Sequence, residues 1–124
     1  MSCLFCDLIN STKKEIFEDE FVYVIKDSFP VSKGHLLVIT KRHIESFFDI
    51  SSDEWTSIKN GLDFGKKYLE KLYKPQGYNI GCNQGKVAGQ TIMHLHIHLI
   101  PRYEFDVEDP SGGIRAVIPG KQKY

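Results

Sequence analysis

The sequence predicts an α+β domain built on an antiparallel sheet, and three observations support this fold class. The chain has 124 residues, of which 41% are hydrophobic and 26% charged, as expected for one globular domain. One long segment, residues 52–74, has helical periodicity, and several short runs elsewhere are rich in β-branched and aromatic side chains. One long helix among several strands is typical of an α+β domain with an antiparallel sheet.

The helix over residues 52–74 carries the clearest local signals. Ser51 and Glu54 have the spacing of a capping box, in which each side chain accepts a hydrogen bond from the other's backbone N–H. Pro75 ends the segment. Apolar residues recur at helical spacing and predict the side of the helix that packs on the sheet. They are Trp55, Ile58, Leu62, Leu69 and Leu72.

Four segments are predicted to be strands because they are short, mostly apolar and bounded by turn residues. The strand over residues 35–40 is almost fully apolar and is expected to be buried on both faces. The strand over residues 94–100 is expected to end at Pro101. FCDLIN, residues 5–10, is expected to form a short helical turn. The strands are EFVYVIKD (20–27), HLLVIT (35–40), YNIGCN (78–83) and HLHIHLI (94–100).

Composition and charge narrow the class of protein. The formal net charge is zero, so no overall field favours nucleic acid as a partner. The longest aliphatic runs, such as residues 36–39, are far too short to cross a membrane, and the first residues lack a signal-peptide pattern. Three cysteines, two of them spaced as Cys3-x-x-Cys6, indicate a cytoplasmic protein rather than a disulfide framework. We expect one domain, residues 1–124, with residues 103–124 as a C-terminal extension.

Three of the five histidines fall in HLHIH, residues 94–98. Successive side chains of a strand point to opposite faces, so His94, His96 and His98 are expected to share one face. Three imidazoles could hold a catalytic zinc with an open fourth position. They could instead bring one nucleophile and two phosphate-contacting groups to a substrate. Chance alone does not readily place three of five histidines on one strand face.

The loop before the histidines favours the phosphate interpretation. Glycines let backbone amides approach an anion closely, and amide or hydroxyl side chains donate hydrogen bonds to phosphate oxygens. A zinc tripod needs no such loop, whereas a phosphate ester that reacts beside the histidines does. The loop residues concerned are Asn83, Gly85, Gly89, Gln90 and Thr91.

This combination of motifs resembles the histidine triad (HIT) family. HLHIHLI matches the family signature of alternating histidine and apolar residues, and FEDE, D-x-x-P, GHLLVI, KRHI and N-x-G-x-x-x-GQT precede it in the family's order. The resemblance runs over residues 3–102. It implies a five-stranded antiparallel sheet with one long and one short helix, and two such chains paired as a homodimer.

The resemblance also implies a reaction. HIT proteins include nucleotide hydrolases and transferases whose middle triad histidine, here His96, attacks the α-phosphorus of a nucleotide. The product of that attack is a covalent nucleotidyl-histidine, which water then resolves. By the same resemblance, His98 and His35 would contact phosphate or orient the nucleophile, and Asp27 would accept hydrogen bonds from the ribose hydroxyls. Asn83, Gly89, Gln90 and Thr91 would hold the phosphate, and Leu4, Phe5 and Ile25 would form the apolar walls around the base.

A second group of residues resembles a structural zinc site. Members of the wider superfamily, including the galactose-phosphate uridylyltransferases, combine a Cys-x-x-Cys pair with a mid-chain histidine and the first triad histidine. The matching residues here are Cys3, Cys6, His43 and His94. Two thiolates and two imidazoles fill a closed tetrahedral site. Such a zinc would tether the N-terminus to the histidine strand, and no metal would be required for the chemistry.

These features predict a hydrolase of adenosine or other purine nucleotides, with a phosphoramidate or a polyphosphate leaving group. Asn83 and Asp27 fit the family's phosphoramidases, whereas LIPR, residues 99–102, fits its polyphosphate-cleaving members. Two other classes of protein stay open. One is a zinc-dependent hydrolase that uses all three triad histidines as ligands. The other is a regulatory module that binds nucleotides with little turnover.

Overall fold

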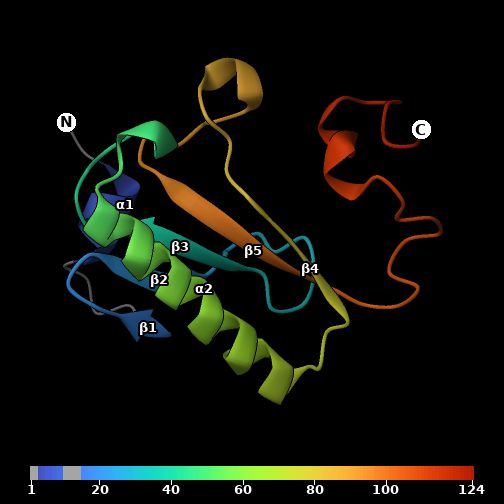
Figure 1. Cartoon of the computed structure of the whole chain (residues 1–124), viewed down its shortest axis with the longest axis horizontal. Helices are drawn as coiled ribbons and strands as arrows, with labels where there is room; N and C mark the ends of the chain where they lie inside the picture. The colour runs from blue at the N-terminus through green and yellow to red at the C-terminus, as the bar shows by residue number, and fades with distance from the viewer. Residues whose placement is uncertain (1–2, 10–14) are drawn as a thin grey trace.

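The computed structural model describes residues 3–9 and 15–124, and a five-stranded antiparallel sheet lies at its centre. The strand order is β1-β2-β3-β5-β4. A short helix, α1 (Leu4–Ile9), and a long helix, α2 (Ser52–Leu72), accompany the sheet (Figure 1). The predicted α+β class and five-stranded sheet are therefore confirmed. The strands are β1 (Phe17–Glu18), β2 (Val22–Lys26), β3 (Leu36–Thr40), β4 (Gly77–Gly81) and β5 (His96–Arg102).

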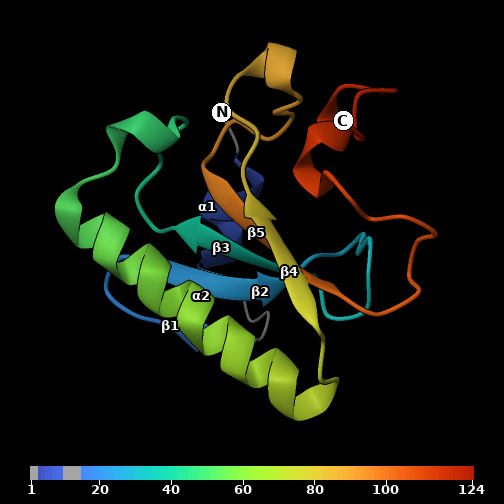
Figure 2. The same ribbon diagram turned by 45° about the vertical axis from the view of Figure 1, so that its right-hand side comes forward.

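The predicted capping box starts α2. The Ser51 hydroxyl accepts a hydrogen bond from Glu54 N at 3.1 Å, and Glu54 Oε1 accepts one from Ser51 N at 2.8 Å. The helix ends at Leu72, two residues earlier than expected, because the chain turns at Lys74, where φ is +54°. Helix α2 lies across one face of the sheet, as both views show (Figure 1, Figure 2).

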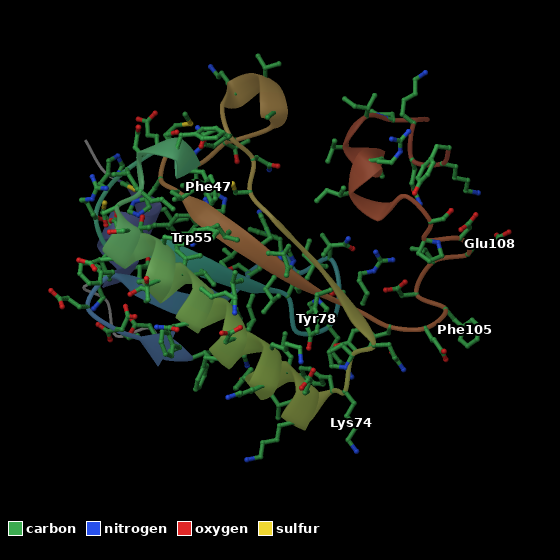
Figure 3. All side chains as sticks on the ribbon, in the orientation of Figure 1. Phe47, Trp55, Lys74, Tyr78, Phe105 and Glu108 are labelled. Atoms are coloured by element: carbon green, nitrogen blue, oxygen red, sulfur yellow. The ribbon has the colours of Figure 1, made fainter. Side chains whose placement is uncertain are left out.

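Two glycines let α2 approach the sheet closely. A side chain at Gly65 would meet Leu99 Cδ2 at 2.9 Å, and one at Gly61 would meet Val24 Cγ2 at 3.2 Å. The apolar pattern of the helix is only partly buried: Trp55 keeps 53% of its surface exposed, so the expectation that it packs on the sheet is wrong. Its ring contacts Phe47 instead, at the start of the helix (Figure 3).

The two faces of the sheet bury different clusters. Strand β3 is buried on both faces, as its apolar sequence predicts. The face opposite α2 carries Tyr23, Ile25, Leu37 and Ile39, which pack with Phe5 of α1. His98 pairs with Leu37 and His96 with Ile39, and cross-strand partners share a face, so both histidines lie on this face. The face under α2 carries Val22, Val24, Leu36, Val38, Ile97 and Leu99.

The observed boundaries of β5 correct two expectations. The strand begins at His96 rather than His94, and it continues through Pro101 to Arg102. The ladder to β3 stops at the pair Leu36–Leu99, so a proline at 101 removes no hydrogen bond to β3. Pro101 O accepts a hydrogen bond from the Ser32 hydroxyl at 2.7 Å on that side.

The remaining elements are short. The predicted turn over residues 5–10 is observed as α1, although Asn10 lies outside the described residues. Strand β1 has two residues, too few for a periodic pattern, and β4 is shifted one residue earlier at its start. Three 3₁₀ helices complete the fold: η1 (Phe47–Asp49), η2 (Lys86–Ala88) and η3 (Gly113–Val117).

Residues 103–124 extend beyond the last strand and contain η3. The extension lies beside β4 and away from α2 (Figure 1, Figure 2). It packs over β4, because a side chain at Gly81 would meet Ile114 Cδ1 at 3.6 Å. Among the described helices, none is long and apolar enough to cross a membrane.

Candidate active site

His96 stands at the start of β5, and its hydrogen bond determines which ring nitrogen carries the proton. Its Nδ1 lies 2.8 Å from the carbonyl oxygen of His94. A carbonyl oxygen only accepts, so Nδ1 is the protonated nitrogen and Nε2 keeps a free lone pair. A neutral imidazole with a free nitrogen is a competent nucleophile. The geometry is thus compatible with the nucleophilic role that the sequence predicts for His96.

His98 has the opposite tautomer, which a chain of hydrogen bonds determines. The backbone N–H of Val31 donates to His35 Nδ1 at 3.1 Å, so the proton of His35 resides on Nε2. That Nε2–H donates to His98 Nδ1 at 2.8 Å. His98 therefore carries its proton on Nε2, where it can donate to a phosphate oxygen or a leaving atom. The two neighbouring histidines present one acceptor and one donor.

Burial keeps this network neutral. The pKa of His35 is lowered mainly by burial, although the charge of Asp27 acts in the opposite direction. The pKa of His98 is lowered by burial first and then by the neighbouring rings of His35 and His96. Both rings are thus neutral near pH 7, which the chain of hydrogen bonds requires.

Asp27 borders the network. Its Oδ2 lies 3.4 Å from His35 Nε2 and 3.9 Å from His98 Nδ1, and its Oδ1 accepts a hydrogen bond from Phe29 N at 2.8 Å. Asp27, His35 and His98 lie close enough together to hold a metal ion. A metal on His35 Nε2 would, however, place the proton on Nδ1, directly facing the Val31 N–H. Two donors facing each other disfavour a metal here, and the trio is better explained as a hydrogen-bond network.

The glycine-rich loop between β4 and β5 is braced from within. Gln90 is 3% exposed, and its Oε1 accepts a hydrogen bond from Gly85 N at 2.9 Å. Its Nε2 donates to Glu45 O at 3.1 Å. Both ends of this amide are therefore occupied, and Gln90 shapes the loop; the direct phosphate contact expected of it stays a prediction. Asn83, Gly89 and Thr91 are exposed on the loop, where a ligand can reach them.

Helix α1 brings an apolar side chain, Phe5, against His96. The Phe5 ring lies 5.0 Å from the His96 ring, between centroids, and Phe5 is almost fully buried. Ile25 belongs to the same buried cluster, whereas Leu4 is about half exposed and does not pack in that cluster. The Tyr23 hydroxyl donates to Phe5 O at 2.6 Å and fixes the helix. Local sequence patterns gave no sign of this role for Tyr23.

The four residues predicted to hold zinc meet at one point. The ligand atoms of Cys3, Cys6, His43 and His94 all lie within 4.8 Å of one another. Cys3 Sγ is 3.4 Å from His94 Nδ1, Cys6 Sγ is 3.3 Å from His43 Nδ1, and the two Nδ1 atoms are 3.2 Å apart. A tetrahedral zinc with bonds of about 2.0–2.3 Å separates its ligand atoms by about 3.3–3.8 Å. The cluster therefore fits zinc closely.

The hydrogen bonds around His94 favour the same ligand set. Its Nε2 lies 2.7 Å from Thr40 O, so the proton resides on Nε2 and the bare Nδ1 faces the two thiols. Burial lowers the pKa of His94, which favours the neutral imidazole that a metal needs. His94 precedes β5, and its Nδ1 faces Cys3, Cys6 and His43. Among the described residues, the three triad histidines do not form one metal-binding group, which counts against a triad zinc.

Comparison with known proteins identifies the family. The model of the HIT domain matches residues 9–105, well over half of the chain.

The chain belongs to the histidine triad (HIT) family.

Relatives of this HIT protein come from archaea, bacteria and eukaryotes. It is 44% identical over 110 residues to an uncharacterized HIT-like protein of Methanocaldococcus jannaschii, a match that covers 86% of this chain and 83% of the relative. It is 33% identical over 93 residues to a bis(5'-adenosyl)-triphosphatase of Dictyostelium discoideum, covering 75% and 62%. A zinc-bound histidine triad family protein from Mycobacterium smegmatis has a TM-score of 0.76 and 31% identity, with 89% and 84% covered.

The HIT motifs did not reveal two further features of the site. One is the Val31 N–H, since the donor is a backbone group and its side chain is unrelated to the interaction. The other is the ion pair between Arg42 and Glu54, in which Arg42 Nη2 lies 2.7 Å from Glu54 Oε1. Arg42 immediately precedes His43, so this pair anchors the segment that carries His43 to the start of α2. Charge spacing along the sequence does not reveal a contact between different elements.

Proposed function

We propose that this HIT protein hydrolyses adenosine or other purine nucleotides at the α-phosphate, through a covalent nucleotidyl-His96 intermediate. The observation that supports this most directly is the pair of opposite tautomers on one sheet face. His96 offers a lone pair on Nε2, and His98 offers a proton on Nε2. Attack at phosphorus needs both a nucleophile and a donor for the charge that develops on oxygen.

The reaction would proceed in two displacements. His96 Nε2 forms a bond to the α-phosphorus, the bond to the leaving group breaks, and the leaving atom takes up a proton from solvent. Water then attacks the phosphorus, the bond to Nε2 breaks, and the water releases a proton. His98 donates a hydrogen bond throughout, and His35 keeps its tautomer unchanged. Two steps with a covalent intermediate replace one difficult displacement.

Substrate contacts follow from the positions of the remaining residues. Asp27 would accept hydrogen bonds from ribose hydroxyls, since a carboxylate has several lone pairs. Phe5, Ile25 and Leu4 would enclose the base, and the glycine-rich loop with Asn83, Gly89, Gln90 and Thr91 would surround the phosphate. The leaving group would be a phosphoramidate nitrogen or a polyphosphate. The relative from Dictyostelium discoideum, a bis(5'-adenosyl)-triphosphatase, supports hydrolysis of this general kind.

The test is AMP release from adenosine phosphoramidate and from a diadenosine polyphosphate. We expect the parent to turn over at least one of them, and His96→Ala to lose at least about a thousandfold in kcat/KM. Met93→Ala, a partly exposed neighbour of the triad, is the matched control and should keep its activity. A reaction quenched in alkaline denaturant should contain protein heavier by one adenylyl group, that is AMP less water, because the P–N bond of a nucleotidyl-histidine survives base and breaks in acid. Equal activity of His96→Ala would reject the nucleophile, and tight AMP binding without turnover would support a binding module.

We also propose that Cys3, Cys6, His43 and His94 hold a structural zinc. The fit of their ligand atoms supports this, together with the zinc-bound relative from Mycobacterium smegmatis. Bound there, zinc would supply structural cross-linking alone. Because His94 O accepts from His96 Nδ1, the metal site would hold both the nucleophile and α1 in place.

Three further expectations complete the proposal. The chain would form a homodimer, as its family resemblance implies, and it would work in the cytoplasm. Residues 1–124 would be one HIT domain in which residues 103–124 form a C-terminal extension. The physiological partner would be a small purine nucleotide.

A further inference from the structure

The β2–β3 loop, residues 27–35, supplies the backbone donor that sets the order of the histidine network. Its Val31 N–H donates to His35 Nδ1 at 3.1 Å, and this contact places the proton of His35 on Nε2. His98 takes its own tautomer from His35. The position of one loop amide therefore determines which nitrogen of His98 carries a proton, and the loop has to be held still for the network to keep its order.

Packing of apolar side chains does not hold this loop. Phe29 is 87% exposed and Val31 72%, and Pro30 between them is exposed as well. Val31 and Ser32 also line a hollow of about 510 Å³ that separates the loop from the C-terminal extension. Apolar side chains that stay in water contribute little to the stability of a loop, so polar contacts have to fix its position.

Two hydrogen bonds beside this hollow tether the loop. The Ser32 hydroxyl donates to Pro101 O of β5 at 2.7 Å, and the Tyr103 hydroxyl donates to Lys33 O at 2.6 Å. Both views place the loop beside the end of β5 (Figure 1, Figure 2). Ser32 and Lys33 directly follow Val31 in the chain. The two bonds therefore fix the backbone next to the donor.

The Ser32 bond closes a ring of interactions around His35. Pro101 lies three residues beyond His98 on the same strand, and Ser32 O accepts a hydrogen bond from His35 N at 3.2 Å. The loop is thus bound on one side to His35 and on the other to the strand that carries His98. A shift of the loop away from the imidazole would break its bond to β5. Fixed partners behind a reacting group keep its orientation and its tautomer.

We propose that Ser32 and Tyr103 are positioning residues for the His98 donor. They hold the β2–β3 loop where its Val31 N–H keeps His35, and through it His98, protonated on Nε2. The inference rests on the function proposed above, in which His98 donates to a phosphate oxygen. It adds two residues that act through the loop backbone.

The pKa of His35 reports on the tether. Burial lowers this pKa and the charge of Asp27 raises it. Asp27, 3.4 Å away, and His98, 2.8 Å away, are the ionisable groups that face His35. The Val31 N–H acts in the same direction as burial, because protonated His35 would point an N–H at another donor. Loss of the tether should therefore raise the pKa of His35, measured by NMR titration of the ring in ligand-free protein.

Matched variants delete one hydroxyl each. Ser32→Ala and Tyr103→Phe should each raise the pKa of His35 and lower kcat/KM about fivefold, the equivalent of one net hydrogen bond. Ser32→Thr keeps a hydroxyl and should restore both parent values. Ser57→Ala is the control, because it deletes a buried hydroxyl that bonds to Asp19, at the other end of β2 from the loop. It should change neither value.

A double-mutant cycle tests whether the tether acts through His35. In the His35→Phe background, Ser32→Ala should lower kcat/KM by less than about 1.5-fold, because the side chain that it positions is gone. A fivefold loss in that background would overturn the proposal, since Ser32 would then act by another route.

The outcomes separate this inference from the proposed function. If nucleotides are cleaved but the pKa of His35 is the same in the parent, Ser32→Ala and Tyr103→Phe, the tether is overturned and the hydrolase stands. If no nucleotide is cleaved, the proposed function fails, and the NMR titration still decides the tether. A pKa that rises in the hydroxyl-deletion variants and not in Ser57→Ala supports it, and an unchanged pKa overturns it.

Discussion

Replacing His35 with phenylalanine tests the hydrogen-bond network behind the candidate active site. The change keeps a flat ring and removes both ring nitrogens, so the Val31 N–H and His98 Nδ1 lose partners that now lie at 3.1 and 2.8 Å. An unpaired buried polar group costs about 1–3 kcal/mol, and the Val31 side of the loop is close to water. We therefore expect the free energy of unfolding to fall by about 1–3 kcal/mol, measured by urea denaturation.

The more specific effect is on the tautomer of His98. In the parent, long-range ¹H–¹⁵N spectra of the ring should show the proton on Nε2 of His98 and on Nδ1 of His96. In His35→Phe, His98 should become a mixture of tautomers, and kcat/KM should fall about tenfold, the equivalent of one lost hydrogen bond. Val31→Ala keeps the backbone N–H and should change neither the tautomer of His98 nor kcat/KM. A parent spectrum with the His98 proton on Nδ1 would refute the reasoning.

The same variant should change how stability depends on pH. Burial lowers the pKa of both His35 and His98, so the unfolded chain binds protons there more readily than the folded one. Their contribution to stability is present above the ordinary histidine pKa of about 6.5 and is lost as the pH falls below it. Each histidine adds a slope of at most about 1.4 kcal/mol per pH unit. In His35→Phe, the free energy of unfolding should fall less steeply between pH 7.5 and pH 5.5 than in the parent. An unchanged slope would contradict this.

Three other predictions concern the metal site and the long helix. Protein purified without added metal should contain about one zinc per chain. Cys6→Ser should have less zinc and a lower melting temperature than the parent. A parent with less than about one-tenth zinc per chain would reject the zinc site. Glu54→Ala removes a capping-box partner and the ion pair with Arg42, and should cost about 2 kcal/mol or more of unfolding free energy. Glu70→Ala, which breaks an exposed ion pair, should cost less than about 0.5 kcal/mol, and equal losses would contradict the argument. Gly65→Ala should destabilise by about 1–3 kcal/mol despite its better helix propensity, since its Cβ would meet Leu99, whereas Gly77→Ala has free space and should be nearly neutral in the same denaturation assay.

Helix α2 shows which structural features the local sequence predicts and which it does not. The capping box, the start of the helix and the burial of Ile58 and Leu69 all follow from spacing within one segment. Trp55 fits the same spacing and is nevertheless half exposed, because η1 and not the sheet lies beside it. Helical periodicity predicts which side of a helix is apolar, but it does not predict how far the sheet extends along that side.

The candidate site also has some features that the sequence predicts and others that only the fold reveals. Alternation along a strand predicts that His96 and His98 share a face, and the observed register confirms this. Alternation also places His94 with them, but His94 lies before β5 and turns to Cys3 and Cys6. The family resemblance, rather than the strand pattern, supplied the four residues that meet there. Gln90 is another case: its amide type suggested a ligand contact, and its burial in the loop is visible only in the fold.

By itself, then, the sequence determined the long helix and four of the five strands, the shared sheet face of His96 and His98, and through its motifs the HIT family. The tertiary structure decided which atoms meet. His94 contacts a cysteine 91 positions away, and His35 bonds to a histidine 63 positions away. A hollow beside His98 exists because residues 103–124 pack over β4. Side-chain periods depend on neighbouring residues alone, whereas tautomers, metal geometry and cavities depend on strand register and on how separate elements pack.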